Sequence, residues 1–159
     1  MIQLYTNPLL FDYIKVCIRM PQDEREQLEA FTGYPYDVDG AAIGNFSAPG
    51  YKWVFKESPE GEPLAIAGFV QQRPGVWRDF MLTTPELWAH YHGVTRIVRR
   101  AINGLLHSGN AHRVECMCLA SREQKNSRWY KTIGYNREAT LYGYAANGAD
   151  AVVFSKVRH

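Results

Sequence analysis

A strand–helix–strand segment in the middle of the chain restricts the fold more than any other feature. Two mostly apolar segments, Val76 to Leu82 and Arg113 to Ala120, predict strands on either side of a helix that begins near Thr84 and ends near His107. A crossover of this kind predicts a βαβ unit, which joins two parallel strands of one sheet. Apolar residues recur along the helix at spacings of three and four and form a continuous core-facing side: Val94, Ile97, Val98, Ala101, Ile102, Leu105 and Leu106.

The remaining segments predict further elements around this unit. Residues 34 to 50 are rich in Gly, Pro, Asp and Asn and are expected to form a long loop. The order of strands and helices predicts a mixed sheet covered by helices on both faces, in a single domain from residue 1 to 159. The other expected strands are Met1–Tyr5, Tyr51–Lys56, Pro63–Val70, Glu138–Tyr144 and Ala151–Val157, and the other expected helices are Pro8–Met20, Asp23–Phe31 and Ser121–Ile133.

Composition argues against several classes of function. The formal net charge of +2 is too small to predict a nucleic-acid-binding surface. The three cysteines and five histidines follow no metal-ligand spacing, so no metal site is expected. The chain shows no signal peptide and no long apolar stretch, which predicts a cytoplasmic protein without membrane insertion. Two basic groups form either solvated helix faces or anion sites: Arg96, Arg99 and Arg100, and Arg122, Lys125, Arg128 and Lys131.

Two short motifs give the first indication of function. Tyr130 is followed four residues later by Gly134 and then by Tyr135. Gly134 is expected to end a helix in a left-handed turn, and Tyr135 to pack back on the core. The second motif, His90-Tyr91-His92-Gly93-Val94-Thr95, follows the fourth strand and contains a single glycine.

The order of elements and the two motifs resemble those of the GCN5-related N-acetyltransferase (GNAT) superfamily. The resemblance implies an α/β fold of the α+β type, with a mixed, mostly antiparallel, twisted sheet and a central βαβ unit. It also implies acetyl-coenzyme A as cofactor and an amine, on a small molecule or a protein, as acceptor. In the family, a glycine-rich turn binds the pyrophosphate through N–H groups at a helix N-terminus, and here that turn is eroded to Gly93.

The resemblance implies roles for individual residues. Tyr130 corresponds to the tyrosine that protonates the departing thiolate of coenzyme A, and alternatively is only a packed aromatic residue. The thioester and pantetheine would lie between the fourth and fifth strands. The positions that correspond to the coenzyme site are Met81, Leu82 and Thr83 in the fourth strand, and His92, Gly93, Val94, Thr95 and Arg96 in the turn.

Asp79 and Glu115 are candidates for the general base. Each lies in the middle of a predicted strand among apolar residues, where a raised pKa would suit a base near neutral pH. Each is alternatively the ion-pair partner of Arg78 or Arg113, or simply exposed at an edge.

The acceptor pocket is expected between the first two helices and the loop from 34 to 50. The loop region combines aromatic and acidic residues, which suits a cationic amine and equally suits a contact between copies of the chain. His90 and His92 are further candidate bases, alternatively exposed turn residues. The residues of the loop region are Tyr34, Tyr36, Phe46 and Tyr51, with Asp37 and Asp39.

A narrower resemblance leads to a second interpretation. Three strings look like a phage branch of the superfamily, which includes the small internal core protein of short-tailed phages. That branch implies a non-catalytic internal virion or assembly protein, with other virion proteins as partners and a place in the host cytoplasm or the virion. Enzyme and structural protein stand side by side at this point. The strings are Pro63-Leu64-Ala65-Ile66 with Gly68, Met81-Leu82-Thr83-Thr84 with Leu87-Trp88, and Lys131-Thr132-Ile133-Gly134.

Overall fold

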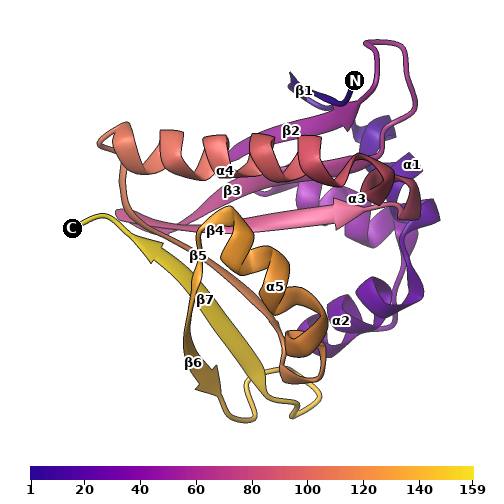
Figure 1. Cartoon of the computed structure of the whole chain (residues 1–159). Coiled ribbons are helices and arrows are strands. Elements are labelled where there is room, and N and C mark those ends of the chain that lie inside the picture. The colour runs from indigo at the N-terminus through magenta and orange to yellow at the C-terminus, as the bar shows by residue number, and fades with distance from the viewer.

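One mixed sheet runs through the computed structural model, which describes residues 1–159 (Figure 1). Its seven strands lie in the order β1-β2-β3-β4-β5-β7-β6. The strands are β1 (Gln3–Thr6), β2 (Tyr51–Lys56), β3 (Ala65–Arg73), β4 (Gly75–Thr83), β5 (Ala111–Leu119), β6 (Asn136–Leu141) and β7 (Ala151–Val157). The helices are α1 (Leu10–Arg19), α2 (Gln22–Thr32), α3 (Val38–Ser47), α4 (Tyr91–His107) and α5 (Glu123–Ile133), with 3-10 turns η1 (Pro85–His90) and η2 (Ala120–Arg122).

The pairing of the strands confirms the expected sheet. β4 and β5 are parallel and are joined by η1 and α4, whereas every other neighbouring pair is antiparallel. The βαβ unit thus stands in the middle of a mostly antiparallel sheet. No helix is both long enough and apolar enough to cross a membrane.

Helices cover both faces of the sheet, as the sequence predicts. α1 and α3 pack on one face, around Tyr13 and Val16 of α1 and Ile66 of β3. α4 and α5 pack on the other, around Ile102 of α4 and Phe154 of β7. In Figure 1 the second pair lies in front of the sheet, and α2 lies to one side, near the ends of β4 and β5. This position of α2 decides how the candidate site is built.

The expectation of a loop from 34 to 50 is wrong, because this segment contains α3. The carboxylate of Asp37 accepts the N–H of Gly40 at 2.7 Å and caps the helix. Ala42 is fully buried beside α1, and the ring of Phe46 meets Tyr13 edge to face. Glycine and alanine in the segment hide the helix from pattern analysis, and packing on α1 stabilises it.

Two helix starts also differ from expectation. Thr84 does not cap a helix, because its hydroxyl donates to the Leu64 carbonyl at 2.9 Å. A 3-10 turn follows it, and α4 begins only at Tyr91. Ser121 lies inside a second 3-10 turn, so α5 begins at Glu123 rather than at a capping box.

The helix-terminating motif behaves as predicted. Gly134 adopts a φ of 105° and ends α5 in the left-handed conformation. The N–H of Tyr135 then donates to the Tyr130 carbonyl at 3.0 Å, and its side chain is buried.

Gly68 of β3 allows a close approach that a side chain would prevent. A Cβ there would lie 2.2 Å from the carbonyl oxygen of Tyr51. We expect Gly68→Ala to lower the free energy of unfolding by about 1–3 kcal/mol, because a backbone atom cannot yield as a flexible side chain does. Gly104→Ala, in α4 where a Cβ has nothing within 4 Å, is the matched control and should raise stability by about 1 kcal/mol. Urea unfolding measures both, and a neutral Gly68→Ala would contradict the close approach.

Candidate active site

The two parallel strands at the centre of the sheet part at their carboxyl ends. β4 and β5 pair only as far as Arg78 and Glu115, although β4 continues to Thr83 and β5 to Leu119. Over this stretch β3 still pairs with β4, and β7 still pairs with β5. A gap therefore opens between two strands that are each held firmly on the other side.

Backbone N–H groups of both strands face this gap. The N–H of Thr84 donates to the Leu64 carbonyl on the β3 side at 3.0 Å, whereas the N–H of Thr83 donates away from β3. Because a strand alternates, the N–H of Met81 also points toward β5. The N–H of Leu119 in β5 donates to a side chain of α2, on the side away from β7.

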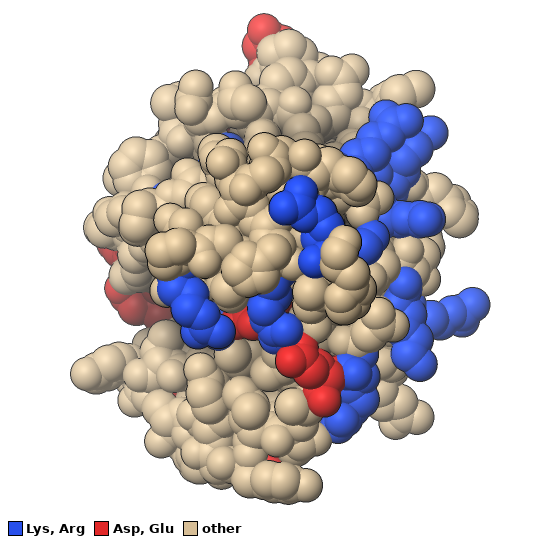
Figure 2. Space-filling view, turned by 90° about the vertical axis from the view of Figure 1, so that its left-hand side faces the viewer, with Lys and Arg blue, Asp and Glu red and all other residues tan.

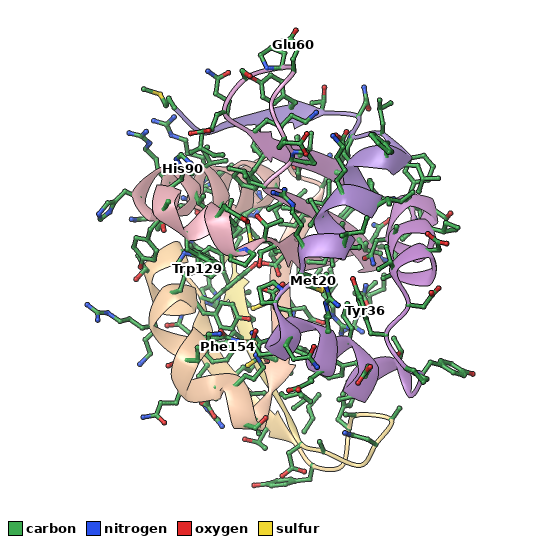
Figure 3. The ribbon with its side chains drawn as sticks, turned by 90° about the vertical axis from the view of Figure 1, so that its right-hand side faces the viewer. Met20, Tyr36, Glu60, His90, Trp129 and Phe154 are labelled. Atoms are coloured by element: carbon green, nitrogen blue, oxygen red, sulfur yellow. The ribbon has the colours of Figure 1, made fainter.

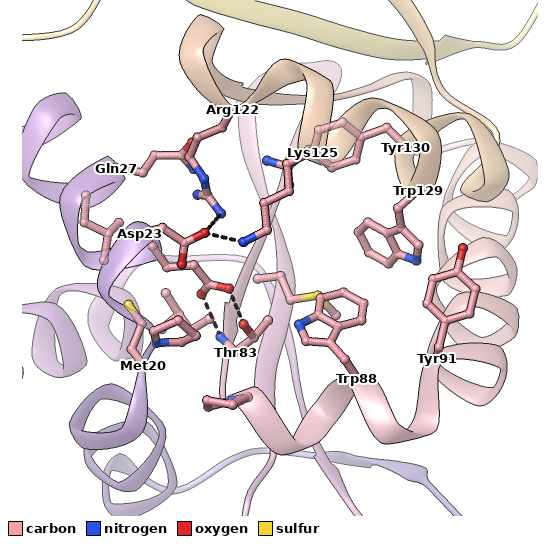
Figure 4. Close-up of a pocket in the computed structure, with 17 residues that line it drawn as sticks. Met20, Asp23, Gln27, Thr83, Trp88, Tyr91, Arg122, Lys125, Trp129 and Tyr130 are labelled. Carbon is pink, nitrogen blue, oxygen red and sulfur yellow. Dashed lines mark hydrogen bonds and ion pairs between the residues drawn. The ribbon is translucent and has the colours of Figure 1, made fainter.

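A cavity of about 530 Å³ lies at the wide end of the gap (Figure 4). Met20 and Trp129 lie on opposite sides of its opening (Figure 3). Leu82 contributes to the wall and to the core cluster around α1. The lining comes from α1 and α2 (Met20, Pro21, Asp23, Glu24, Gln27, Leu28), from β4 and the segment after it (Met81, Leu82, Thr83, Pro85, Trp88, Tyr91), and from η2 and α5 (Arg122, Lys125, Asn126, Trp129, Tyr130).

Side chains of α2 close the gap by bonding to both strands. The carboxylate of Glu24 accepts the N–H of Thr83 at 3.3 Å and also the Thr83 hydroxyl. The amide oxygen of Gln27 accepts the N–H of Leu119 at 3.0 Å. Glu24 and Gln27 are three residues apart and share one face of the helix. That face supplies the hydrogen bonds that β4 and β5 no longer give each other.

Asp23 fastens the same helix to η2 and α5 (Figure 4). Its carboxylate pairs with Arg122 at 3.1 Å and with Lys125. The hydrogen bond from Lys125 holds the pKa of Asp23 below its usual value, whereas burial raises the pKa of Glu24. The sequence analysis named Arg122 and Lys125 but missed Asp23, Glu24 and Gln27, because the first two turns of α2 are polar or charged at every position. Their spacing on one helical face was the available signal.

Tyr130 lies on α5 and borders the cavity. Its ring centroid is 4.9 Å from that of Phe154, so it is a packed aromatic residue as well as part of the wall. Burial raises the pKa of its phenol well above the usual value. The phenol is therefore protonated at neutral pH and is able to donate.

Asp79 is enclosed beneath α4, away from the large cavity. Its carboxylate accepts a hydrogen bond from the Tyr135 hydroxyl, and burial raises its pKa to about 7. Asp79 borders a separate, mostly apolar cavity of about 40 Å³. The pKa rise expected from the sequence is present, but the group does not reach the large cavity.

Glu115 is held between two arginines. Its carboxylate lies 2.8 Å from Arg78 Nη2 and 2.8 Å from Arg113 Nε. Burial raises the pKa of Glu115, but the hydrogen bonds from the two guanidinium groups outweigh it and the net pKa is lowered. The ion-pair interpretation accounts for Glu115, and this placement argues against a role as base.

Solved structures with the same arrangement of elements identify the fold. The chain matches a GNAT-family acetyltransferase from Bacillus anthracis with a TM-score of 0.72 at 12% identity, over 98% of this chain and 94% of that chain. The fold is that of the GNAT acetyltransferases. A variant of spermidine N-acetyltransferase from Vibrio cholerae gives a TM-score of 0.70 at 12% identity, over 98% and 94% of the two chains. Aminoglycoside acetyltransferase AAC(6')-Ib, solved with coenzyme A and kanamycin, gives 0.68 at 16% identity, over 99% and 95%.

Sequence comparison adds nothing to this assignment. No protein-family model and no curated protein matches the chain. The GNAT resemblance is thus supported at the level of the fold, and nothing in these comparisons supports the phage branch.

The residues of the expected GNAT pyrophosphate turn fall into two groups at the start of α4. His92 and Arg96 are exposed. Val94 is fully buried, and a Cβ on Gly93 would lie 2.6 Å from Cγ2 of Ile2. The glycine therefore lets α4 pack against the N-terminal segment, which is a structural reason for its presence.

Thr95 links α4 to α5. Its hydroxyl donates to the Tyr91 carbonyl at 2.7 Å and accepts the indole N–H of Trp129 at 3.0 Å. The ring of Trp88 meets Trp129 edge to face, with centroids 5.4 Å apart. Thr95 is thus buried and fully bonded. His90 pairs with Glu57 at 3.2 Å.

The segment from 34 to 50 does not border the cavity at the parted strands. Tyr34 and Pro35 instead line a separate hollow, together with Glu26 and Glu29 of α2. The Tyr36 hydroxyl donates to the Cys17 carbonyl at 2.6 Å, and Tyr51 stacks on Trp77 at a centroid distance of 5.1 Å. None of the aromatic residues named for the expected acceptor pocket lines the large cavity. The segment packs against α1 through α3, and α2 lies beside the gap instead.

The residues of the two basic groups also lie in different places, some exposed on the surface and one at the cavity. Figure 2 shows Lys and Arg side chains along the edge of the molecule where α4 and α5 lie. Arg99, Arg100, Arg128 and Lys131 are exposed there. Arg122, in contrast, lies at the cavity, and its Nε is buried without a hydrogen-bond partner.

The raised pKa of Asp79 makes stability depend on pH. Its pKa is 3.8 unfolded and about 7 folded, so its proton is held more tightly in the folded state. As pH rises from 5 to 8 the native protein should lose roughly 2.5 kcal/mol of stability at most through this group. Asp79→Asn removes that loss. The free energy of unfolding of the variant, relative to that of the native protein, should therefore increase as the pH rises.

Urea unfolding at pH 5, 6, 7 and 8 measures the difference. The titratable groups that interact with Asp79 are Arg78, Tyr135, Cys116 and Tyr130, and none of them is changed. Asp39→Asn, at an exposed position of α3, is the control for loss of a carboxylate elsewhere. A difference between native protein and Asp79→Asn that stays constant with pH would contradict the burial argument.

Proposed function

We propose that this protein is an acetyl-coenzyme A–dependent N-acetyltransferase that acts on an amine. The observation that carries the proposal is the gap between β4 and β5, where the N–H groups of Met81 and Thr83 that point away from β3 meet the cavity bordered by Tyr130. The Thr83 N–H bonds to a side chain of α2, which an acetyl group can displace. Acyl transfer needs a hydrogen-bond donor for the developing oxyanion and an acid for the leaving group. Both are available within this one cavity.

The walls of the cavity suit an acetyl thioester on a long flexible arm. The amide groups along the arm can pair with the free edge of β4, as an added strand does. Met81 and Trp88 offer apolar surface, and Arg122 brings a guanidinium group with an unused N–H. Acetyl-coenzyme A supplies the activated acetyl group, and the residues around it position that group.

Two groups of the chain act on the reacting atoms in this proposal. The N–H of Thr83 donates to the carbonyl oxygen of the thioester, where negative charge develops. The Tyr130 phenol, which its raised pKa keeps protonated, gives a proton to the departing thiolate. A donor that is already in place needs no reorganisation during the reaction.

The phosphates of the coenzyme are assigned to the start of α4. No side chain caps the N-terminus of this helix, so its N–H groups and its dipole remain for an anion. Arg96 and His92 are exposed beside it. Val94 and Thr95 are buried and are left out of the proposed coenzyme contacts.

An amine is proposed as the acceptor because proteins of the same fold are named for amine substrates, spermidine and aminoglycosides. The competing proposal is a non-catalytic phage internal or assembly protein, for which the eroded glycine turn and the three phage-like strings are the supporting features. Binding of the coenzyme separates the two.

Calorimetric titration with acetyl-coenzyme A tests the coenzyme site. We expect binding by the native protein and a loss of roughly tenfold or more in affinity for Arg96→Glu, because the substitution replaces a charge-assisted hydrogen bond to phosphate with repulsion. Arg73→Glu, at the exposed last residue of β3, makes the same charge change away from the proposed site and should bind normally. No binding by the folded native protein would refute the proposal and leave the structural role.

Tyr130→Phe tests the acid. The phenyl ring keeps the packing on Phe154, so acetyl-coenzyme A should bind with unchanged affinity. Turnover of an amine acceptor should fall by roughly 100-fold, the lower range for loss of a general acid. Release of free thiol from acetyl-coenzyme A measures the rate, and unchanged turnover would leave Tyr130 as a packing residue alone.

A further inference from the structure

Glu24 is the one carboxylate at the large cavity that forms no ion pair. The cavity wall holds two carboxylates, Asp23 and Glu24. Asp23 is paired with Arg122 and Lys125. Glu24 accepts hydrogen bonds from Thr83 only. A positive group that enters the cavity therefore finds its natural partner at Glu24.

The position of Glu24 is tied to the atoms that react. One of its oxygens occupies the N–H of Thr83, the donor that the proposed function assigns to the acetyl carbonyl. The other oxygen accepts the Thr83 hydroxyl. When an acetyl group takes the N–H, it displaces the first oxygen, and the hydroxyl still holds the carboxylate beside the thioester. Binding of the thioester thus frees a carboxylate oxygen of Glu24 that otherwise accepts the Thr83 N–H.

We infer that Glu24 takes the proton from the acceptor, and that the acceptor is a primary alkylammonium ion. This inference rests on the proposed function and adds the base and the substrate class. An alkylammonium ion has no lone pair to attack with until it loses a proton, so its acetylation needs a base at the site. Asp79 and Glu115 do not border the cavity.

The step balances as follows. The ammonium ion gives one proton to Glu24, and the freed lone pair of nitrogen forms a C–N bond with the thioester carbon. The C–S bond breaks with its electron pair on sulfur, and Tyr130 donates its phenolic proton to that sulfur. The second proton of the nitrogen passes through water to restore Tyr130, and Glu24 releases its proton to solvent.

The surroundings of Glu24 suit a proton acceptor. Burial raises its pKa, while the hydrogen bonds from Thr83 and the charge of Arg122 oppose that rise, and Asp23 adds to it. Lys125 faces Asp23 from α5, and Tyr91 and Tyr130 complete the titratable lining.

The test compares native protein with Glu24→Gln, which keeps an oxygen for Thr83 and removes the base. Glu26→Gln, on the same helix but exposed and outside the cavity, is the matched control. The probes are spermidine and benzylamine, which are ammonium ions at pH 7.5, and 4-methylaniline, an isomer of benzylamine that is neutral there. Calorimetry with acetyl-coenzyme A and thermal unfolding accompany each variant.

We expect Glu24→Gln to bind acetyl-coenzyme A like the native protein and to lose roughly 100-fold in kcat with spermidine and benzylamine. The loss with 4-methylaniline should be less than about threefold, since that amine needs no deprotonation before attack. Glu24→Asp, which restores a carboxylate, should recover part of kcat. If the role of Glu24 were purely structural, Glu24→Gln would lower kcat equally with all three acceptors, and Glu24→Asp would not recover it.

Other outcomes overturn the inference in separable ways. Failure of the native protein to bind acetyl-coenzyme A overturns the proposed function, and this inference with it. Binding and turnover with native kcat in Glu24→Gln overturns the base alone. Turnover of 4-methylaniline without turnover of either ammonium probe overturns the substrate class.

Discussion

The parting of β4 and β5 is the constraint on which the rest of the structure depends. Two strands that separate leave unpaired N–H groups inside the protein, and a buried N–H without a partner is costly. β4 cannot follow β5, because β3 holds it through the register of Ala65 with Thr83. β5 is held in the same way by β7, as far as Leu119. The gap is therefore fixed by the outer pairings, and something else must bond to its edges.

α2 meets this requirement with side chains instead of backbone. Glu24 and Gln27 bond to Thr83 and Leu119, one on each strand. Because both bonds come from one helix, α2 links β4 to β5. A movement of α2 would break the bonds to both strands together. The arrangement also explains why the helix carries so much charge, since only polar side chains can replace a missing strand.

The sequence predicts much of this architecture and little of the site. The core-facing stripe of α4 has a strong period, so the βαβ unit and the mixed sheet follow from it directly. The capping glycine of α5 is equally local, since Gly134 alone sets the turn. The contacts of Glu24 with Thr83 span 59 positions of the chain, and no local pattern encodes a pairing at that distance. The role of α2 was hidden for this reason.

The same limit explains the turn before α4. A single glycine in the expected place suggests a remnant of a phosphate-binding loop. In the structure, however, Gly93 makes room for the side chain of Ile2, a residue near the N-terminus. One local feature thus has two physical explanations, and only the tertiary contact distinguishes them.

Three carboxylates near the parted strands illustrate how partners decide chemistry. Glu115 lies between two guanidinium groups, which stabilise its charged form and remove it from proton transfer near neutral pH. Asp79 has a raised pKa but is enclosed beneath α4. Glu24 combines a raised pKa with a place on the cavity wall. A base must be free of cationic partners that hold it in its charged form, and it must reach the substrate. Among these groups only Glu24 forms no ion pair and also borders the large cavity. Glu24 lies far in sequence from β4 and β5. This follows from the gap, because the two strands part there and a third element has to supply the side chain between them.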